Sequence, residues 1–195
     1  MKIGCWVLVA MLLTGCAGAG SNSDAGLGRD AASQHALRVA HHQSIAITRE
    51  EALGIVEDMN AVLSIQDNAA DVVCGVEFVL SGGLSAFSLG TGVISSTEDF
   101  ASLYTRVPGE IKVVNMINYC GRFGAFLGCA PVPGESLLVV RSSRRVEGAL
   151  WAHEYGHNQG LSHRSVSRAL MNPVVTSRTR VVNQQECKQF EAGEE

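Results

Sequence analysis

Three histidines and one glutamate fall close together near the C-terminal end of the chain, in the stretch His-Glu-Tyr-Gly-His-Asn-Gln-Gly-Leu-Ser-His. His153 and His157 are four residues apart, so on a helix they share one face and can bind the same metal ion. Glu154 can then reach a water molecule on that metal. Gly160 can adopt the left-handed conformation that ends a helix, and the turn would bring back His163 as a third nitrogen ligand. Three neutral imidazoles leave the fourth position of a tetrahedral Zn²⁺ open, as metal-assisted hydrolysis requires.

Two other interpretations of this stretch are weaker. In the first, the histidines are simply solvated on a polar helix, but half of the six histidines in the chain would then fall at ligand spacing by accident. In the second, the zinc site is structural, yet structural sites are usually closed by a fourth protein ligand and the stretch offers none. The sequence therefore predicts one catalytic Zn²⁺ bound by the three histidines.

The stretch resembles the signature HExxHxxGxxH of the metzincin clan of zinc metallopeptidases, in which a methionine turn follows. The segment Ala169-Leu170-Met171-Asn172-Pro173 is the candidate for that turn. The resemblance implies that the three histidines are zinc ligands and that Glu154 is the general base. It also implies that Gly160 reverses the chain and that Met171 forms the floor of the site. Some metzincins have a tyrosine ligand where this chain has Pro173, so the site is more similar to the matrixin and reprolysin type than to astacins or serralysins.

The order of the predicted elements is also similar to the minimal metzincin plan. We expect helices over about 49 to 66, 97 to 104, from 143 and from 183, and strands over about 72 to 80, 84 to 88, 91 to 95, 111 to 119 and 137 to 141. This layout predicts an α+β fold, a minimal zincin domain whose mixed, twisted sheet accompanies an active-site helix and a C-terminal helix.

In metzincins the strand before the metal helix is the sheet edge to which extended substrate adds. The resemblance therefore implies that a peptide is held by the backbone groups of Ser136, Leu137, Leu138, Val139 and Val140. A plain core strand is the alternative for this segment.

The start of the chain has the pattern of an exported protein. The apolar run over residues 3–13 follows a lysine and is too short to span a bilayer, so residues 1–15 are predicted to be a secretory signal peptide. Leu13-Thr14-Gly15-Cys16 resembles the lipobox of bacterial lipoproteins. That resemblance implies cleavage before Cys16, acylation of this cysteine and anchoring at the outer membrane. An ordinary secreted protein is the alternative.

The remaining residues divide into three predicted segments. Residues 16–47 are expected to form the lipidated N-terminus and a flexible tether with solvated histidines, because much of the segment has little apolar mass. This segment could also act as a short pro-segment. Residues 48–190 are long enough for one domain with a core, and residues 191–195 are expected to fray.

The net charge limits the classes of possible partner, and the cysteine content indicates the cellular compartment. The formal net charge of −4 argues against a nucleic-acid partner, and we expect a monomer that meets peptide or protein substrates and, through its lipid, a membrane. Four cysteines lie in the predicted domain, an even number that favours disulfides in an exported chain. Three pairings are open. We favour Cys120 with Cys129, which flank a short glycine-rich loop, and hence Cys74 with Cys187.

These observations predict a zinc-dependent endopeptidase. Zinc would lower the pKa of its water toward about 7, and Glu154 would take the proton of that water and pass it to the leaving amine. One alternative is a zinc-containing surface lipoprotein that binds a partner without cleaving it, although the intact Glu154 argues against that interpretation. The other is a zinc amidase that acts on cell-wall peptides.

Overall fold

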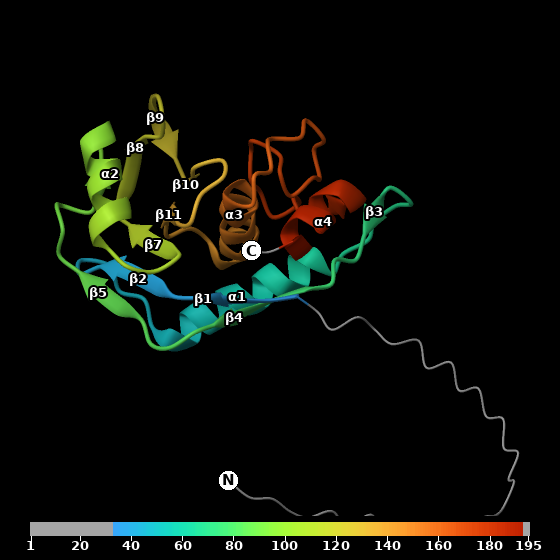
Figure 1. Cartoon of the computed structure of the whole chain (residues 1–195), viewed down its shortest axis with the longest axis horizontal. Coiled ribbons are helices and arrows are strands. Elements are labelled where there is room, and N and C mark those ends of the chain that lie inside the picture. The colour runs from blue at the N-terminus through green and yellow to red at the C-terminus, as the bar shows by residue number, and fades with distance from the viewer. Residues whose placement is uncertain (1–32, 193–195) are drawn as a thin grey trace, which may run out of the picture.

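The computed structural model describes residues 33–192 and has the α+β fold that the sequence predicts. Its helices are α1 (Arg49–Leu63), α2 (Thr97–Arg106), α3 (Arg144–Asn158) and α4 (Gln184–Ala192). Its strands are β1 (Ser33–Leu37), β2 (Val39–His42), β3 (Asp71–Val72), β4 (Val76–Leu80), β5 (Ser85–Phe87), β6 (Val93–Ile94), β7 (Ile111–Val114), β8 (Met116–Tyr119), β9 (Phe123–Phe126), β10 (Gly128–Cys129), β11 (Leu137–Val140) and β12 (Val182–Asn183). In Figure 1, α3 lies between α2 with β8 and β9 on one side and α4 with β3 on the other.

A five-stranded mixed sheet positions α3, the helix that carries His153 and His157 and is called the metal helix below. Its strand order is β10-β11-β7-β2-β5, and neighbouring strands are parallel except for β10, which runs antiparallel to β11 at one edge. Strand β1 leads directly into β2 and pairs with β4 in a separate parallel ladder. Strand β11 leads into α3, so the helix begins at the end of a strand that has partners on both sides.

Helix α1 begins where the sequence predicts and packs closely on α3. The Thr48 hydroxyl accepts a hydrogen bond from the Glu51 N–H and the Glu51 carboxylate accepts one from the Thr48 N–H, which is the predicted capping box. Gly148 of α3 sets the distance between the two helices, because a Cβ there would collide with Asp58 and with the backbone of Met59. The close approach buries the apolar face of α1 in the main core.

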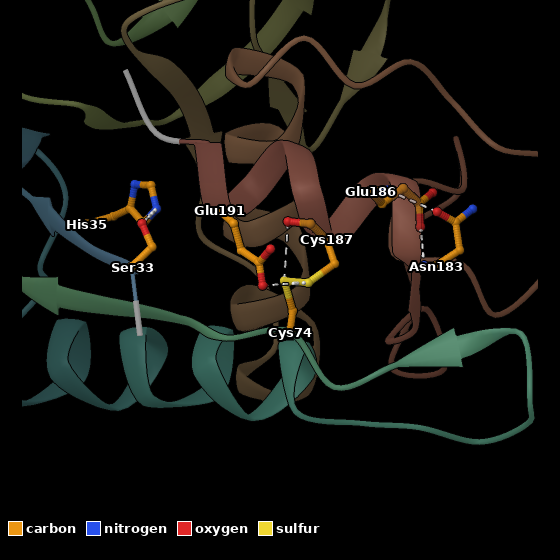
Figure 2. The surroundings of a disulfide bond; sticks show 7 residues. All are labelled: Ser33, His35, Cys74, Asn183, Glu186, Cys187 and Glu191. Carbon is orange, nitrogen blue, oxygen red and sulfur yellow. Dashed lines mark hydrogen bonds between the residues drawn. A yellow bond between two sulfur atoms is a disulfide. The ribbon is translucent and has the colours of Figure 1, made fainter. Parts of the chain in front are cut away.

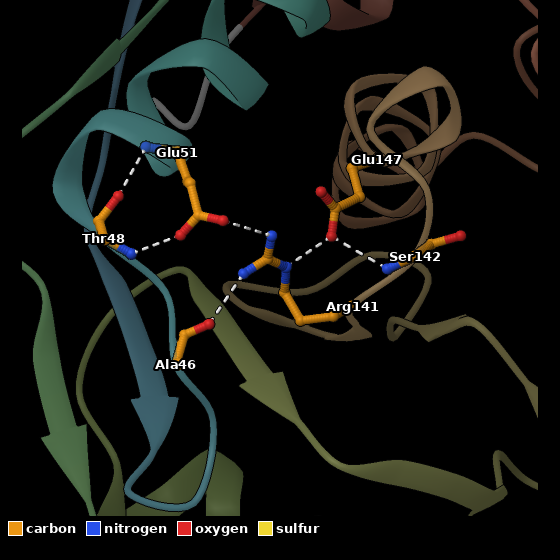
Figure 3. Close-up of polar contacts among 6 residues, drawn as sticks. All are labelled: Ala46, Thr48, Glu51, Arg141, Ser142 and Glu147. Atoms are coloured by element: carbon orange, nitrogen blue, oxygen red, sulfur yellow. Dashed lines mark hydrogen bonds and ion pairs between the residues drawn. The ribbon is translucent and has the colours of Figure 1, made fainter.

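A network around Arg141 joins three elements at the start of α3 (Figure 3). The guanidinium donates to Glu147 Oε1 at 2.7 Å, to Glu51 Oε1 at 3.2 Å and to the Ala46 carbonyl at 3.1 Å. The Ser142 N–H donates to the same Glu147 oxygen at 2.9 Å. The end of β11, the start of α1 and the first turn of α3 are therefore held by one cation and two carboxylates.

Both favoured disulfide pairings are present. Cys120 and Cys129 join the loop region before β9 to the edge strand β10, with Cα atoms 5.8 Å apart. Cys74 and Cys187, with Cα atoms 5.3 Å apart, fasten α4 to the segment between β3 and β4 (Figure 2). Phe190, fully buried on the same helix, packs its ring on α3 and β4. The second disulfide therefore holds α4 against the metal helix.

The predicted domain boundary at residue 48 is wrong. Residues 33–42 form two strands of the domain, and Leu37, Val39 and Ala40 are each 1% exposed. Two of the three histidines that we expected to be solvated, His35 and His42, are buried. The strands are too short and too rich in histidine and alanine to show a clear alternating pattern, so tertiary pairing decides their structure.

The structure describes the region of the predicted C-terminal boundary but not that of the predicted signal peptide. Helix α4 continues through Ala192, so the predicted frayed tail does not begin at residue 191. The predicted signal peptide over 1–15 and the predicted lipidation at Cys16 lie outside the described residues. Within residues 33–192, no helix has the length and apolar character needed to cross a bilayer.

Candidate metal centre

The structure brings the three predicted ligands together. One nitrogen from each of His153, His157 and His163 lies within 4.8 Å of the others, and the Nε2 atoms of His157 and His163 are 3.1 Å apart. Two nitrogens bound tetrahedrally to one zinc at about 2.0–2.1 Å would be roughly 3.3 Å apart. The separation of His157 and His163 is therefore close to that of two ligands on one zinc ion, and a nitrogen of His153 lies near enough to join them.

Backbone carbonyls fix the orientation of both helical histidines. His153 Nδ1 lies 2.8 Å from the Leu170 carbonyl, and His157 Nδ1 lies 2.7 Å from the Leu161 carbonyl. Because a carbonyl only accepts, each Nδ1 must carry the proton, which leaves Nε2 unprotonated for a metal. Burial also lowers the pKa of His153 to about 4, so its imidazole is neutral at physiological pH.

The end of α3 has the turn that the motif predicts. Gly160 has φ of 84°, in the left-handed region. Its N–H donates to the His157 carbonyl, and the Leu161 N–H donates to the Gly156 carbonyl, each at 2.9 Å. This pattern is a Schellman motif. It reverses the chain within two residues and returns it toward the metal centre, where His163 completes the ligand set.

The predicted methionine turn packs directly under the metal helix. Met171 is fully buried, and a Cβ on Gly156 would collide with its sulfur. Gly156 lies between His153 and His157 in the sequence, so Met171 packs against the part of α3 that carries these two histidines. The adjacent Leu170 carbonyl is the acceptor for His153, and the same turn therefore supports the helix and orients one ligand.

Glu154 lies in a cleft of about 620 Å³ together with the three histidines. It is 6% exposed, and burial raises its pKa to about 8. Within residues 33–192 its carboxylate has no hydrogen bond or ion pair. It lies against the edge strand β10, because a Cβ on Gly128 would overlap the carboxylate. A carboxylate in this position is free to exchange a proton with a group in the cleft.

The predicted substrate strand is wrong. The segment over 136–140 is not at the sheet edge, because β11 pairs with β7 on one side and with β10 on the other. Leu137, Leu138 and Val139 are completely buried. The open edge beside Glu154 belongs instead to β10, and Leu127, Gly128 and Cys129 line the cleft. The plain core strand, our alternative for this segment, is what the structure shows.

The walls of the cleft are mainly apolar on the side opposite β10. Leu150 of α3 lines it, together with Pro173, Val174 and Val175 from the segment that follows Met171. Val174 is 67% exposed. Arg122 is the one cation among the residues that line the cleft, and its charge together with burial lowers the pKa of His163.

One polar residue near Glu154 had no signal in the sequence. The hydroxyl of Tyr104, on α2, donates to the carbonyl of Cys129 in the edge strand at 3.4 Å. Burial and the charge of Glu154 both raise the pKa of this phenol. Tyr104 was predicted only as the end of a short helix, because its contact with β10 depends on how α2 packs on the sheet.

Comparison with known proteins gives a match to one family model and matches to many solved structures. The family model for Matrixin matches residues 142–189, from the end of β11 into α4. No curated protein matches the chain. The crystal structure of archaemetzincin from Methanopyrus kandleri superposes with a TM-score of 0.56 at 13% identity, over 85% of this chain and 97% of the other. This similarity shows that the two chains share a zincin-like α+β fold.

Proposed function

We propose that this protein is a zinc-dependent endopeptidase. The observation that supports the proposal best is the pairing of three converging imidazole nitrogens with one carboxylate, Glu154, that has no partner among the described residues. The Matrixin match over 142–189 covers this same segment, and the fold similarity to archaemetzincin is consistent with it. A catalytic rather than structural site is favoured because the chain supplies three ligands and a cleft.

Each group of residues in the cleft would have its own role in peptide-bond hydrolysis. His153, His157 and His163 would hold the zinc, which when bound polarises a carbonyl and makes water acidic enough to react near neutral pH. Glu154 would accept a proton from the attacking water and deliver it to the leaving nitrogen, because its carboxylate lies in the cleft with the three histidines and has no partner among residues 33–192. The edge of β10 that has no strand partner among residues 33–192 would align the peptide by backbone hydrogen bonds.

A peptide library with mass-spectrometric detection tests this proposal. The purified protein should cleave internal peptide bonds, lose activity with a chelator and regain it when zinc is added back. Purified peptidoglycan in a parallel reaction tests the amidase alternative. Cleavage of cell-wall peptides alone would replace endopeptidase by amidase, and no cleavage of either by the zinc-loaded protein would favour a non-catalytic binding protein.

We also propose that the chain is exported and anchored through an acylated Cys16, with the outer membrane as its destination. The two disulfides support export, because disulfides form and persist mainly in oxidising compartments. Mass spectrometry of the mature N-terminus tests this proposal, and an uncleaved or unmodified N-terminus would contradict it.

A further inference from the structure

A second cavity, of about 480 Å³, lies on the other side of the segment that connects β10 to β11. Ala130 and Val132 of this segment line the metal cleft, whereas Gly134 and Ser136 line the second cavity. The end of α2, the start of β7 and the last turn of α3 supply most of the remaining wall. The volume is within the range of small-molecule sites, which is about 300–1,000 Å³.

The cavity collects buried polar side chains. Five of the residues that line it are polar or charged and at most 9% exposed: His35, Lys112, Ser136, Asn158 and Gln159. Buried polar groups cost free energy unless they are hydrogen-bonded, so their concentration in one cavity needs a reason. Among residues 33–192, Lys112 forms no ion pair and Asn158 Oδ1 accepts no hydrogen bond.

Lys112 is a buried cation that forms no direct ion pair within residues 33–192, although the charge of the nearby Glu110 acts on it. It is 1% exposed, and its Nζ donates to the Gly109 carbonyl at 2.7 Å and lies 5.3 Å from the centre of the Tyr104 ring. No carboxylate among residues 33–192 forms an ion pair with it, since the neighbouring Glu110 binds Arg38 through both oxygens. Burial lowers the pKa of Lys112 to about 8. An ammonium group has three donors, so a bound anion could satisfy the remainder.

Asn158 supplies an acceptor that has no donor. It is 5% exposed, and its Oδ1 has no hydrogen-bond partner within the described part of the chain. Its backbone carbonyl accepts a hydrogen bond from the Gly134 N–H at 3.0 Å, which places the side chain beside the connecting segment. An N–H group on a ligand would satisfy this oxygen.

We propose that this cavity binds a small carboxylate with an N–H group beside it, as in an N-acylated amino acid or the C-terminal residue of a peptide. Lys112 pairs with the carboxylate, and Asn158 Oδ1 accepts the N–H hydrogen bond. A neutral ligand would leave the ammonium unpaired, and a carboxylate without an N–H would leave the amide oxygen unsatisfied. The proposal does not depend on zinc or on peptidase activity.

The small number of lysines makes a direct test practical. The chain has three, Lys2, Lys112 and Lys188, and Lys188 is exposed on α4. In the zinc-loaded protein labelled with ¹³Cε-lysine, N-acetylglycine should shift the Lys112 resonance saturably and leave that of Lys188 unchanged. N-acetylglycine methylamide, which lacks the carboxylate, should have no effect. Prior addition of acetohydroxamate, which would occupy the zinc site, should not alter the shift.

Two variants assign the two contacts. Lys112→Met should weaken N-acetylglycine binding in calorimetry by about tenfold or more, as expected for loss of a buried charge-assisted bond, whereas the matched Lys188→Met should not. Asn158→Ala should weaken N-acetylglycine about fivefold but leave propionate, which has no N–H, unchanged. The proposal is overturned if Lys112 fails to shift in the unmodified chain, if the methylamide shifts it equally, or if inorganic phosphate saturates it while N-acetylglycine does not.

Discussion

Helix α3 carries two buried glutamates in surroundings of opposite kind. Glu147, in the first turn, is 2% exposed and accepts hydrogen bonds from the Arg141 guanidinium and the Ser142 N–H (Figure 3). Glu154, two turns later, is 6% exposed and has neither an ion pair nor a side-chain hydrogen bond among residues 33–192. Burial raises its pKa to about 8.

The different surroundings of the two carboxylates indicate different roles, one in the stability of the fold and the other in the proposed reaction. A buried carboxylate that serves the fold needs a cation or donors, because an unpaired one costs free energy, and Glu147 has them. Glu154 has neither a cation nor hydrogen-bond donors among residues 33–192 to offset its burial, and it lies beside three imidazoles that can bind a metal. Perturbed and unpaired groups of this kind concentrate at functional sites. Under the proposed function, Glu154 is the reacting group at the third turn of α3, and Glu147 is a structural anchor at the first.

The largest expected effect is loss of the metal, because without zinc the proposed reaction at Glu154 cannot proceed. His157→Ala removes one of three ligands together with the bond to the Leu161 carbonyl, so zinc should fall far below one ion per chain in elemental analysis. His41→Ala is the control, since His41 lies outside the metal group, and it should keep full zinc. Stoichiometric zinc in His157→Ala would remove the basis of the comparison.

Removal of the unpaired carboxylate should abolish turnover and spare the fold. Glu154→Gln is expected to lower kcat/KM by about 10³-fold, the usual contribution of a general base, while zinc content stays at one. Its free energy of unfolding should be unchanged or higher, because a buried carboxyl without partners is replaced by a neutral amide. Turnover near that of the unmodified protein would rule out Glu154 as the base.

The partnered carboxylate should show the reverse behaviour. Glu147→Gln leaves Arg141 without its buried partner, and we expect the free energy of unfolding to fall by about 2 kcal/mol in urea titrations. Below the unfolding transition, kcat/KM should stay within about twofold, since the first turn is remote from the cleft. Glu51→Gln is the matched control. It removes the exposed carboxylate on the same guanidinium and should cost much less. A large loss of kcat/KM in folded Glu147→Gln would show that the two glutamates are not separable.

Helices α1 and α3 could be predicted from the sequence because local rules determine them. The spacing of His153 and His157, the left-handed Gly160 and the capping box at Thr48 each act within one or two turns, and the structure has all of them. Both favoured cysteine pairings are present, and the short glycine-rich loop between Cys120 and Cys129 was the local signal that favoured them among the three open pairings.

The parts that the sequence did not predict depend on pairing between distant segments. Strand β10 has only two residues, Gly128 and Cys129, which are too few to show an alternating pattern, so its place at the sheet edge comes from its partner β11. Strands β1 and β2 were assigned to a tether for the same reason. Lys112 lies in an otherwise apolar strand, where a lysine is expected to be exposed, and only the packed structure shows it buried.

The smallest expected effect concerns the strand that lies beside Glu154. The Tyr104 hydroxyl donates to the Cys129 carbonyl at 3.4 Å, and we infer that it helps to hold β10 in place for substrate. Tyr104→Phe keeps the stacking on Phe100, at 4.3 Å between ring centroids, and removes only that bond. We expect kcat/KM on a peptide substrate to fall about threefold, mostly through KM, as one weak hydrogen bond would allow.

Tyr119→Phe is the matched control for this last change. It removes a hydroxyl that bonds Thr97, at the opposite end of α2, and should leave kcat/KM unchanged. If Tyr104→Phe instead lowered kcat by more than about 10²-fold with KM unchanged, the hydroxyl would act in the transition state itself. The unpaired state of Glu154 would then describe only the protein without substrate, and the distinction between the two glutamates would have to include Tyr104.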